Sequence, residues 1–582
     1  MPDHLRANGL SSYSVHASEQ ATEPAGRSLR AELDGAPTSA TGSSDVDPET
    51  AARRLLHQAL ASDAVPSFTA PVSDGVTSEF RTINTETVPL TGTRIVKFRQ
   101  TVHDIPVYGS LLSVELDESN GLVGIDSALG EPTGVDPVAA IAPVDALAAA
   151  VAAPDGYTPR LTGVVPRLHY YFDAATSTWR LAYLLQDVPV TTDRSTEPAS
   201  GQPSTLEPPR IVDYVVDAHQ GTVVAVLPRT PSVAADTQTG LAAGEPQTGT
   251  DAMGVERHFV ASREGGALVL VDPEHNVRTY DFGFGDPAVD GDTLPGTAVA
   301  NPPVWSPGAV SAHANAVAVS DFLRTVLFRD NIDDRGTALV SSVNCVVADA
   351  TPGHQEWHNA FWNGAQMVYG QALHGAELRT LAANVDVVAH EMFHGVTDHT
   401  SRLEYAVQPG ALNESYSDIF GTIVANLGAD DPRRWDWELG ENLLADDRPL
   451  RDLSDPARFD QPAHMDDFQV LPNTRAGDWG GVHVNSGIHN KAAYLVLTAA
   501  GDDGVLRLTP GEVAAVFYLA LTQRLSRTSQ FVDSRRAVVA SARSLFRRLP
   551  AAERQGKITA IEAAFEAVGI LAGVPAPAVV PH

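Results

Sequence analysis

The chain has 582 residues and a formal net charge of −32, because 72 Asp and Glu outnumber 40 Lys and Arg. A surface this acidic repels phosphate backbones, which argues against a nucleic-acid-binding role. Hydrophobic residues make up 43% of the chain, enough for several packed cores, and a single cysteine, Cys345, excludes an intrachain disulfide. The sequence contains no run of about 18 apolar residues, so no transmembrane helix is predicted.

In the first 230 residues, a segment expected to lack regular structure is followed by segments expected to form helices and strands. Residues 1–47 are rich in Ser, Ala, Gly and Asp and nearly lack large apolar side chains, which predicts a mobile leader. A short helix is expected at 48–61. Near-alternating apolar residues over 78–128 and 165–227 predict strands, with an Ala- and Val-rich helical stretch at 137–153 between them.

The remaining residues predict a linker and a larger domain. Residues 228–253 carry Gly, Pro and Thr without large side chains, which is typical of a linker. The pattern is β-rich with long loops from 254 to about 350, and helical from about 378 onward. We therefore expect an α+β protein in which a β-rich region precedes a helical one.

The sequence H-E-x-x-H at 390–394 indicates a metal site. His390 and His394 are four residues apart, so on a helix they share one face and both imidazoles can bind one Zn²⁺. Glu391 lies about 100° further round the helix, where it can take a proton from a metal-bound water. A chance pair of helix histidines is the alternative, and this motif alone leaves it open.

A second stretch with helical spacing supports the prediction of a metal site. Glu414 and Asp418 are also four apart on one face, with apolar residues on both sides. Glu414 can supply the third zinc ligand, and Asp418 can accept the free ring N–H of a ligand histidine. A solvated acidic face is the alternative. The metzincin spacing H-E-x-x-H-x-x-G-x-x-H is absent, because Thr397 and Thr400 stand at the positions of its Gly and last His.

Four separated motifs resemble the thermolysin-like zinc metalloendopeptidases, in order and over about residues 254–570. They are HEMFHGVTDHT with ALNESYSDIFGTIV at 390–424, NAFWNGAQMVYG at 359–370, GGVHVNSGIHNKAAYLV at 480–496 and AFEAVGI at 564–570. The resemblance implies a two-lobed zincin catalytic domain, with a β-rich N-terminal lobe, a helical C-terminal lobe and the zinc helix between them.

The resemblance also implies catalytic roles by position. The two motif histidines and Glu414 would hold one catalytic zinc. Glu391 would activate the zinc-bound water and pass its proton to the leaving amine. Tyr405 and His483 would hydrogen-bond the oxyanion, and Asp478 would orient His483.

Further residues would bind the substrate. Asn359 and Ala360 match residues that bind the peptide backbone, and Arg451 matches an arginine that binds a carbonyl beyond the scissile bond, with a surface ion pair as the alternative. An apolar pocket would select large hydrophobic residues just after the scissile bond, unless its members are ordinary core. Its members would be Leu378, Leu381, Val387, Leu439 and Leu450.

Calcium binding departs from the family pattern. Ala425 stands where a bridging carboxylate is expected, and Asn442 replaces another acid. Two adjacent dications need shared negative charge, so we expect a single Ca²⁺ site rather than a double one, with an acidic surface patch as the alternative. The matching acids are Asp386, Asp436, Glu438 and Glu441.

The N-terminal region resembles the prodomain of such enzymes, in VKFRQTVHDIPVYGSLLSVEL and in RIVDYVVDAHQGTVVAV, whose pattern is strand, D-x-x-x-G turn, strand. The resemblance implies a monomeric zymogen whose prodomain aids folding and covers the cleft until it is cut away. The expected organisation is a mobile leader (1–63), a first prodomain module (64–135), a second prodomain module (136–230), a linker with the cleavage site (231–253), the β-rich lobe (254–389), the helical lobe (390–571) and a tail (572–582).

Two alternatives remain open from the sequence alone. One is a specialised toxin or effector protease, and the other is a non-catalytic zinc protein that only holds a peptide. The resemblance implies secretion and protein or peptide substrates. Residues 1–20, however, contain no apolar run of a secretory signal, which leaves non-classical export as an expectation.

Overall fold

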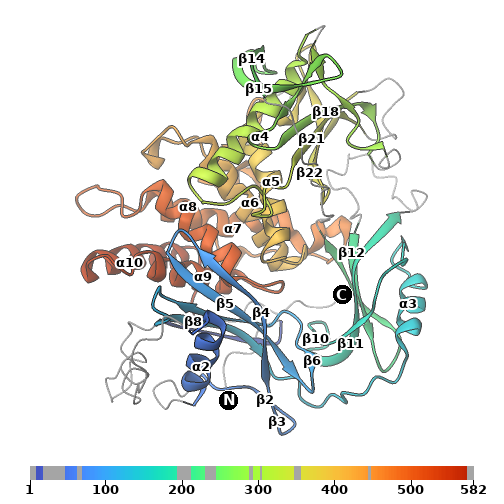
Figure 1. The fold of residues 1–582 in the computed structure, drawn as a ribbon, viewed down its shortest axis with the longest axis vertical. Coiled ribbons are helices and arrows are strands. Elements are labelled where there is room, and N and C mark those ends of the chain that lie inside the picture. The colour runs from blue at the N-terminus through green and yellow to red at the C-terminus, as the bar shows by residue number, and fades with distance from the viewer. Residues whose placement is uncertain are drawn as a thin grey trace.

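The computed structural model describes residues 8–16, 46–61, 68–192, 211–229, 244–287, 293–301, 304–346, 355–443 and 447–572. In Figure 1 the first small sheet module lies at the bottom, the second lies at the right beside the helical lobe, and a β-rich lobe stands at the top. The α+β class with a two-lobed C-terminal unit is therefore confirmed. No helix among these described residues is long and apolar enough to cross a membrane.

The first module is a six-stranded antiparallel sheet with one helix packed on it. Its strand order is β1-β8-β7-β5-β4, with β6 beside β5. Helix α2 begins after Asp47, whose side chain accepts from the Thr50 N–H, and its buried face includes Leu55 and Leu56. The elements are β1 (Leu10–His16), α2 (Pro48–Leu60), β2 (Val72–Ser73), β3 (Val76–Thr77), β4 (Glu79–Val88), β5 (Thr93–Val102), β6 (Ile105–Pro106), β7 (Leu111–Leu116) and β8 (Leu122–Gly130).

Strand β1 lies where composition predicted a leader without regular structure. It pairs antiparallel with β8 and buries Leu10. Its Ser12 hydroxyl also donates to Asp533, 3.0 Å away in the helical lobe. An edge strand held by backbone pairing and by a distant helix needs few apolar side chains, so composition did not reveal it. Helix α2 confirms the predicted short helix, and residues 17–45 lie outside the described residues.

The second module is a five-stranded antiparallel sheet of order β10-β11-β12-β13, with β9 beside β11. The predicted D-x-x-x-G turn is present: Asp217 accepts from the backbone N–H groups of His219 and Gln220, and Gly221 takes φ +70°. The elements are α3 (Pro143–Val151), β9 (Tyr157–Pro159), β10 (Arg167–Asp173), β11 (Thr178–Thr192), β12 (Ile211–Asp217) and β13 (Val223–Arg229).

The β-rich lobe has a four-stranded sheet, β14-β15-β16-β20, and a seven-stranded sheet of order β17-β18-β21-β23-β22, with β19 beside β18 and β24 beside β23. Strand β22 is therefore at an edge. The strands are β14 (Glu245–Thr250), β15 (Glu256–Glu264), β16 (Ala267–Val269), β17 (Val271–Asp272), β18 (Val277–Gly285), β19 (Thr297–Ala298), β20 (Ala300–Asn301), β21 (Leu339–Cys345), β22 (Trp357–Trp362), β23 (Met367–His374) and β24 (Glu377–Thr380).

A 19-residue helix in this lobe, α4 (Pro307–Thr325), was not predicted. Most of its residues are buried, including the polar Ser311 and Asn315. A helix that is buried nearly all round has no polar stripe, so its sequence lacks the 3.6-residue period that marks a surface helix.

The helical lobe follows the predicted pattern. Helix α5 packs on α6, and also on α4 and β22 of the other lobe, so it runs between the two lobes. The larger elements are α5 (Val385–His399), α6 (Val407–Ala425), β25 (Glu438–Leu439), β26 (Arg451–Asp452), α7 (Asp478–Thr498), α8 (Pro510–Leu519), α9 (Phe531–Leu545) and α10 (Ala551–Ala567). Short 3₁₀ turns and one π turn join them: η3 (Leu381–Ala383), η4 (Pro432–Arg434), η5 (Pro456–Phe459), η6 (Met465–Asp467), η7 (Arg475–Gly477) and η8 (Ala520–Arg524).

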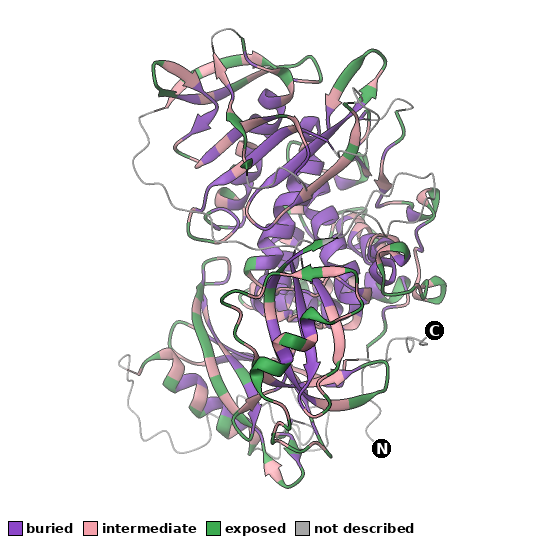
Figure 2. Cartoon of the chain, turned by 90° about the vertical axis from the view of Figure 1, so that its right-hand side faces the viewer, coloured by how far each residue is buried: buried purple, intermediate pink, exposed green. Residues whose placement is uncertain are grey.

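The two lobes share one hydrophobic core, while each N-terminal module has its own. One cluster of buried residues in mutual contact includes Phe259 in β15 and Phe565 in α10. Buried residues are purple in Figure 2 and fill the inside of the upper lobe. The core of the first module is one cluster, and the cluster of the second module also includes Leu10 and Val102 of the first. Neither cluster includes residues of the two-lobed unit, so the N-terminal modules pack on that unit with cores of their own.

Candidate active site

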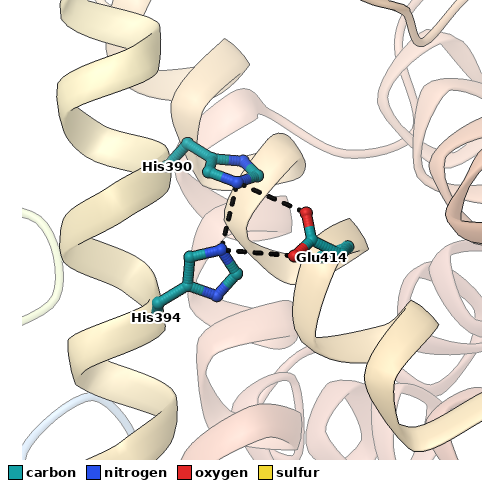
Figure 3. Close-up of side chains that lie close together, drawn as sticks. All are labelled: His390, His394 and Glu414. Carbon is teal, nitrogen blue, oxygen red and sulfur yellow. Dashed lines mark hydrogen bonds and ion pairs between the residues drawn. The ribbon is translucent and has the colours of Figure 1, made fainter. Parts of the chain in front are cut away.

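Three metal-binding side chains converge between helices α5 and α6. His390 and His394 lie one turn apart on α5, and their Nε2 atoms face each other at 3.1 Å. Glu414 enters from α6, with one carboxylate oxygen 3.4 Å from His390 Nε2 and the other 3.5 Å from His394 Nε2 (Figure 3). All three side chains are buried.

These residues fit a zinc ion. Their ligand atoms lie within 4.8 Å of one another, and they are the only such His, Cys, Asp or Glu group among the described residues. Glu414 Oε2 is buried and has no hydrogen-bond partner in that part of the chain. Two imidazoles and a carboxylate form the ligand set of a catalytic zinc with an open fourth position.

The charges around the three ligands favour the binding of a cation. Burial opposes charge on Glu414, but the imidazoles of His483, His394 and His390 hold its pKa well below the usual value. Burial likewise opposes a proton on His390, but Asp418 and Glu414 raise its pKa to about 10. These charges favour an ionised Glu414 and a proton on His390 in the metal-free site, so a metal that binds there competes with that proton.

Polar groups behind the ligands orient the two rings. His390 Nδ1 lies 2.8 Å from Asp418 Oδ1, and His394 Nδ1 lies 2.8 Å from Asn413 Oδ1. With Nδ1 occupied on each ring, Nε2 points toward Glu414. Asp418 was predicted from its spacing. Asn413 was not predicted, because nothing in the sequence indicates that an asparagine next to Glu414 contacts the His394 ring.

Asp418 is also the centre of a buried polar cluster. Arg451 places two guanidinium nitrogens 2.7 and 3.1 Å from Asp418 Oδ1, and Asn490 donates to Oδ2 at 2.8 Å. Arg451 thus forms an ion pair, and because its side chain is 16% exposed and its partner is buried, this pair lies mostly below the surface. Asn490 lies in the motif 480–496, but its position along the chain gives no reason to join it to Asp418.

Glu391 lies beside the triad, next to an edge strand. Its Oε2 accepts the Trp362 backbone N–H at 3.0 Å, at the end of β22. Asn359 and Ala360 lie on the same strand. Because β22 is at the edge of its sheet, its outer backbone groups can pair with an extended peptide.

A second set of donors faces Glu414 from the helical lobe. The Tyr405 hydroxyl donates to Glu414 and lies 3.3 Å from His483 Nε2. His483 Nδ1 lies 2.7 Å from Asp478, at the start of α7. Burial opposes a proton on His483, but Glu414 and Asp478 outweigh it and raise its pKa. Tyr405 and His483 therefore place two polar groups in one region, beside Glu414.

The predicted specificity pocket is only partly assembled as expected. Leu381, Val387 and Leu439 form one apolar cluster, with Leu450 packed against it. Leu443 also belongs to this cluster and was not predicted. Leu378, on β24, is 37% exposed and lies outside the cluster.

The predicted calcium acids lie around β25. Asp386 is buried and accepts from the Gly440 N–H at 2.9 Å, and burial together with Glu441 raises its pKa to about 7. Glu438 instead pairs with Arg458 at 2.8 Å. The Asp436 side chain accepts the Glu438 N–H. Of the predicted calcium acids, Glu441 contributes to the raised pKa of Asp386.

The second module covers the Tyr405 side of the site. The Tyr405 N–H donates to the carbonyl of Pro228, in β13, at 3.4 Å. A cavity of about 760 Å³ remains between this module and the helical lobe, with Trp479 and Glu404 in its wall. Burial raises the pKa of the Glu404 carboxyl to about 7. Strand β13 therefore contacts the chain at Tyr405, on this side of the site.

Three family models match the chain. The catalytic domain of thermolysin metallopeptidases matches residues 246–398, their alpha-helical domain matches 401–570, and the fungalysin/thermolysin propeptide motif matches 78–129. The last match falls on the first module, which supports an intramolecular prodomain.

Relatives cover the same regions. Neutral protease NprE of Bacillus pumilus is 36% identical over 327 residues, 56% of this chain and 98% of that protein. Thermostable neutral protease NprT of Geobacillus stearothermophilus is 30% identical over 517 residues, 82% of this chain and 84% of that protein. Bacillolysin of Bacillus subtilis strain 168 is 34% identical over 362 residues, 62% of this chain, and the match spans 61% of bacillolysin's length. The resemblance read from the motifs is thus confirmed, and the chain belongs to the thermolysin metallopeptidase family.

Proposed function

We propose that this chain is the inactive precursor of a zinc endopeptidase that cleaves before large hydrophobic residues. The observation that carries the proposal is the convergence of His390, His394 and Glu414 on one point, with Glu391 beside them. A purely binding site would not need Glu391, Tyr405 and His483 together with these ligands, which weighs against a non-catalytic zinc protein.

The three ligands would hold zinc, and the residues behind them would keep it in place. Zinc, when bound, polarises the scissile carbonyl and makes an attacking water more acidic. Asp418 and Asn413 hold the two imidazole rings with Nε2 inward, at 2.8 Å each. Arg451 and Asn490 in turn fix Asp418, which supports a positioning role for Arg451 beside the predicted contact with substrate.

The polar residues would move protons and bind the developing charge. The Trp362 N–H holds one oxygen of Glu391, which leaves the other for the attacking water. Glu391 would take the proton of that water and return it to the leaving amine. Tyr405 and His483, 3.3 Å apart at their polar atoms, would donate to the oxyanion, with Asp478 orienting His483. Asn359 and Ala360 would pair with the substrate backbone along β22.

We expect cleavage mainly before Leu, Phe and Ile, because the cluster of Leu381, Val387 and Leu439, which is buried in the precursor, contains only apolar side chains. Cleavage-site profiling on a denatured proteome tests this. Leu450→Trp should shift the profile toward smaller residues, because Leu450 packs against the cluster. Leu427→Trp, at an exposed leucine after α6 that belongs to neither the cluster nor the predicted pocket, is the matched control. A majority of acidic or basic residues after the scissile bond would contradict the prediction.

A single Ca²⁺ near Asp386 and Glu441 is also part of the proposal. Asp386 is buried, and the charge of Glu441 adds to burial in raising its pKa, so the two carboxylates lie near enough to share one cation. The proposal also includes action outside the cell and removal of the prodomain by a cut within residues 231–253. N-terminal sequencing of protein from culture medium and from cells tests both, since it reports location and processing together.

The activity is tested by removing zinc. Casein hydrolysis by the processed protein should stop with 1,10-phenanthroline and return when zinc is added back. Retained zinc with no hydrolysis of casein or of peptides would instead favour the non-catalytic alternative. A narrow profile on a few proteins only would favour a specialised effector protease.

A further inference from the structure

Two arginines of the helical lobe are paired with carboxylates of the prodomain. Arg402 Nη2 lies 2.9 Å from Asp187 on β11, and Arg527 Nη1 lies 2.7 Å from Asp213 on β12. Among the described residues, neither guanidinium has a carboxylate partner within the two-lobed unit. Both would therefore lose their counter-ions when the prodomain leaves.

This arginine pair lies close to the proposed oxyanion residue. Arg402 is three residues before Tyr405, and the Arg527 carbonyl accepts the Glu404 N–H at 2.9 Å. On the prodomain side, β13 reaches Tyr405 through the carbonyl of Pro228. The surface under β12 and β13 is thus continuous with the active site.

The prodomain carboxylates occupy a built anion site. Asp213 is fully buried, and Arg229 and Arg527 hold its pKa below the usual value despite burial. Arg229 also lies 3.6 Å from Asp187, so two carboxylates are shared among three guanidiniums. Arg402 Nε is buried without a hydrogen-bond partner in the described part of the chain. A cavity of about 380 Å³ is lined by both arginines of the pair.

The pair stands out from its surroundings. Residues 254–570 themselves contain more Asp and Glu than Lys and Arg, so the processed enzyme is acidic. Glu404 of the helical lobe also interacts electrostatically with Arg527, and burial raises the pKa of its carboxyl to about 7. Guanidinium groups bind carboxylates through several hydrogen bonds, which suits them to acidic side chains.

We propose that Arg402 and Arg527 form a subsite for acidic side chains of the substrate, upstream of the scissile bond. The prodomain, which precedes its own cleavage site, supplies Asp187 and Asp213 as the present occupants. The processed enzyme then binds Asp or Glu of a protein substrate in their place. This inference rests on the proposed function, because it needs prodomain removal and peptide hydrolysis.

The first test uses the unaltered protein, produced as the full chain and allowed to mature. Peptide pairs carry one hydrophobic residue after the scissile bond and either Glu or Gln at successive upstream positions. We expect the Glu peptide to be cleaved about tenfold more efficiently at one upstream position, and salt to reduce that ratio. Without a local cationic site, an acidic enzyme repels an acidic peptide, and salt would raise the ratio.

Variants assign the effect to the pair. Arg402→Gln and Arg527→Gln should bring the Glu/Gln ratio close to one, mainly through KM. Glu404→Gln should increase it, because a neighbouring negative charge is removed. Arg548→Gln is the matched control: Arg548 also faces the prodomain, but it pairs with Glu118 of the first module, and its ratio should match the parent's.

Several results would overturn the subsite. A ratio of one or less at every upstream position, a ratio that salt raises, or a preference only downstream would do so while hydrolysis itself persists. If a variant is not recovered folded, the salt dependence of the unaltered enzyme still decides. Absence of hydrolysis of both peptides of every pair would instead overturn the proposed function, and the subsite with it.

Discussion

Replacing Glu391 by Gln should reduce peptide hydrolysis about a thousandfold, because general acid–base groups contribute 10²–10⁴-fold to such reactions. Gln keeps the shape of Glu391 and an oxygen that can accept the Trp362 N–H, so the surrounding structure and the zinc ligands are preserved. The loss should therefore appear in kcat, with zinc content unchanged. The measurement is kcat and KM on a peptide, with zinc determined in the same sample.

Precursor processing gives this variant a second readout. If maturation is self-catalysed, the Glu391→Gln chain should remain full length, and normal processing would indicate another protease. A limited cut by an added protease then frees the variant for the kinetic assay. Glu377→Gln, an exposed position on β24, is the matched control and should behave like the parent. Undiminished hydrolysis by Glu391→Gln would contradict its proposed role as the base.

Replacing Asp418 by Asn should weaken both the fold and the metal site. Arg451 would keep a buried charge without its carboxylate, which costs about 3–5 kcal/mol of stability. His390 would lose the charged partner of its Nδ1, and loss of such a partner lowers metal affinity about 10–100-fold. Thermal unfolding and zinc competition with a chromogenic chelator measure the two effects separately.

The matched comparisons separate charge from packing. Asp430→Asn, at an exposed position just after α6, should change neither quantity. Asp418→Asn combined with Arg451→Met removes both charges, so it should unfold at a higher temperature than Asp418→Asn alone. Equal stability of Asp418→Asn and the parent would show that the Asp418–Arg451 pair, 2.7 Å apart, does not stabilise the fold.

The helical lobe was predictable because its helices keep regular apolar spacing and its ligands have fixed intervals. His390 with His394, and Glu414 with Asp418, each lie one turn apart, so local helix geometry already places them. Their meeting depends on the packing of α5 on α6, which the spacing alone does not give.

The residues that were missed depend on tertiary contacts. Helix α4 is buried nearly all round and has no period to read, and β1 is held by a sheet edge and by α9. The roles of Asn413 and Asn490 follow only from their contacts with the His394 ring and the Asp418 carboxylate. The pairing of Arg402 and Arg527 with the prodomain joins residues more than 200 positions apart.

Titration of the metal-free, processed protein with zinc tests the central claim most directly. Hydrolysis of a peptide with Leu after the scissile bond should rise in proportion to bound zinc and reach its plateau at one zinc per chain. The His394→Ala chain should show neither the tight binding nor the rise. Stoichiometric zinc binding without hydrolysis, or full hydrolysis in the metal-free protein, would contradict the assignment of a zinc endopeptidase.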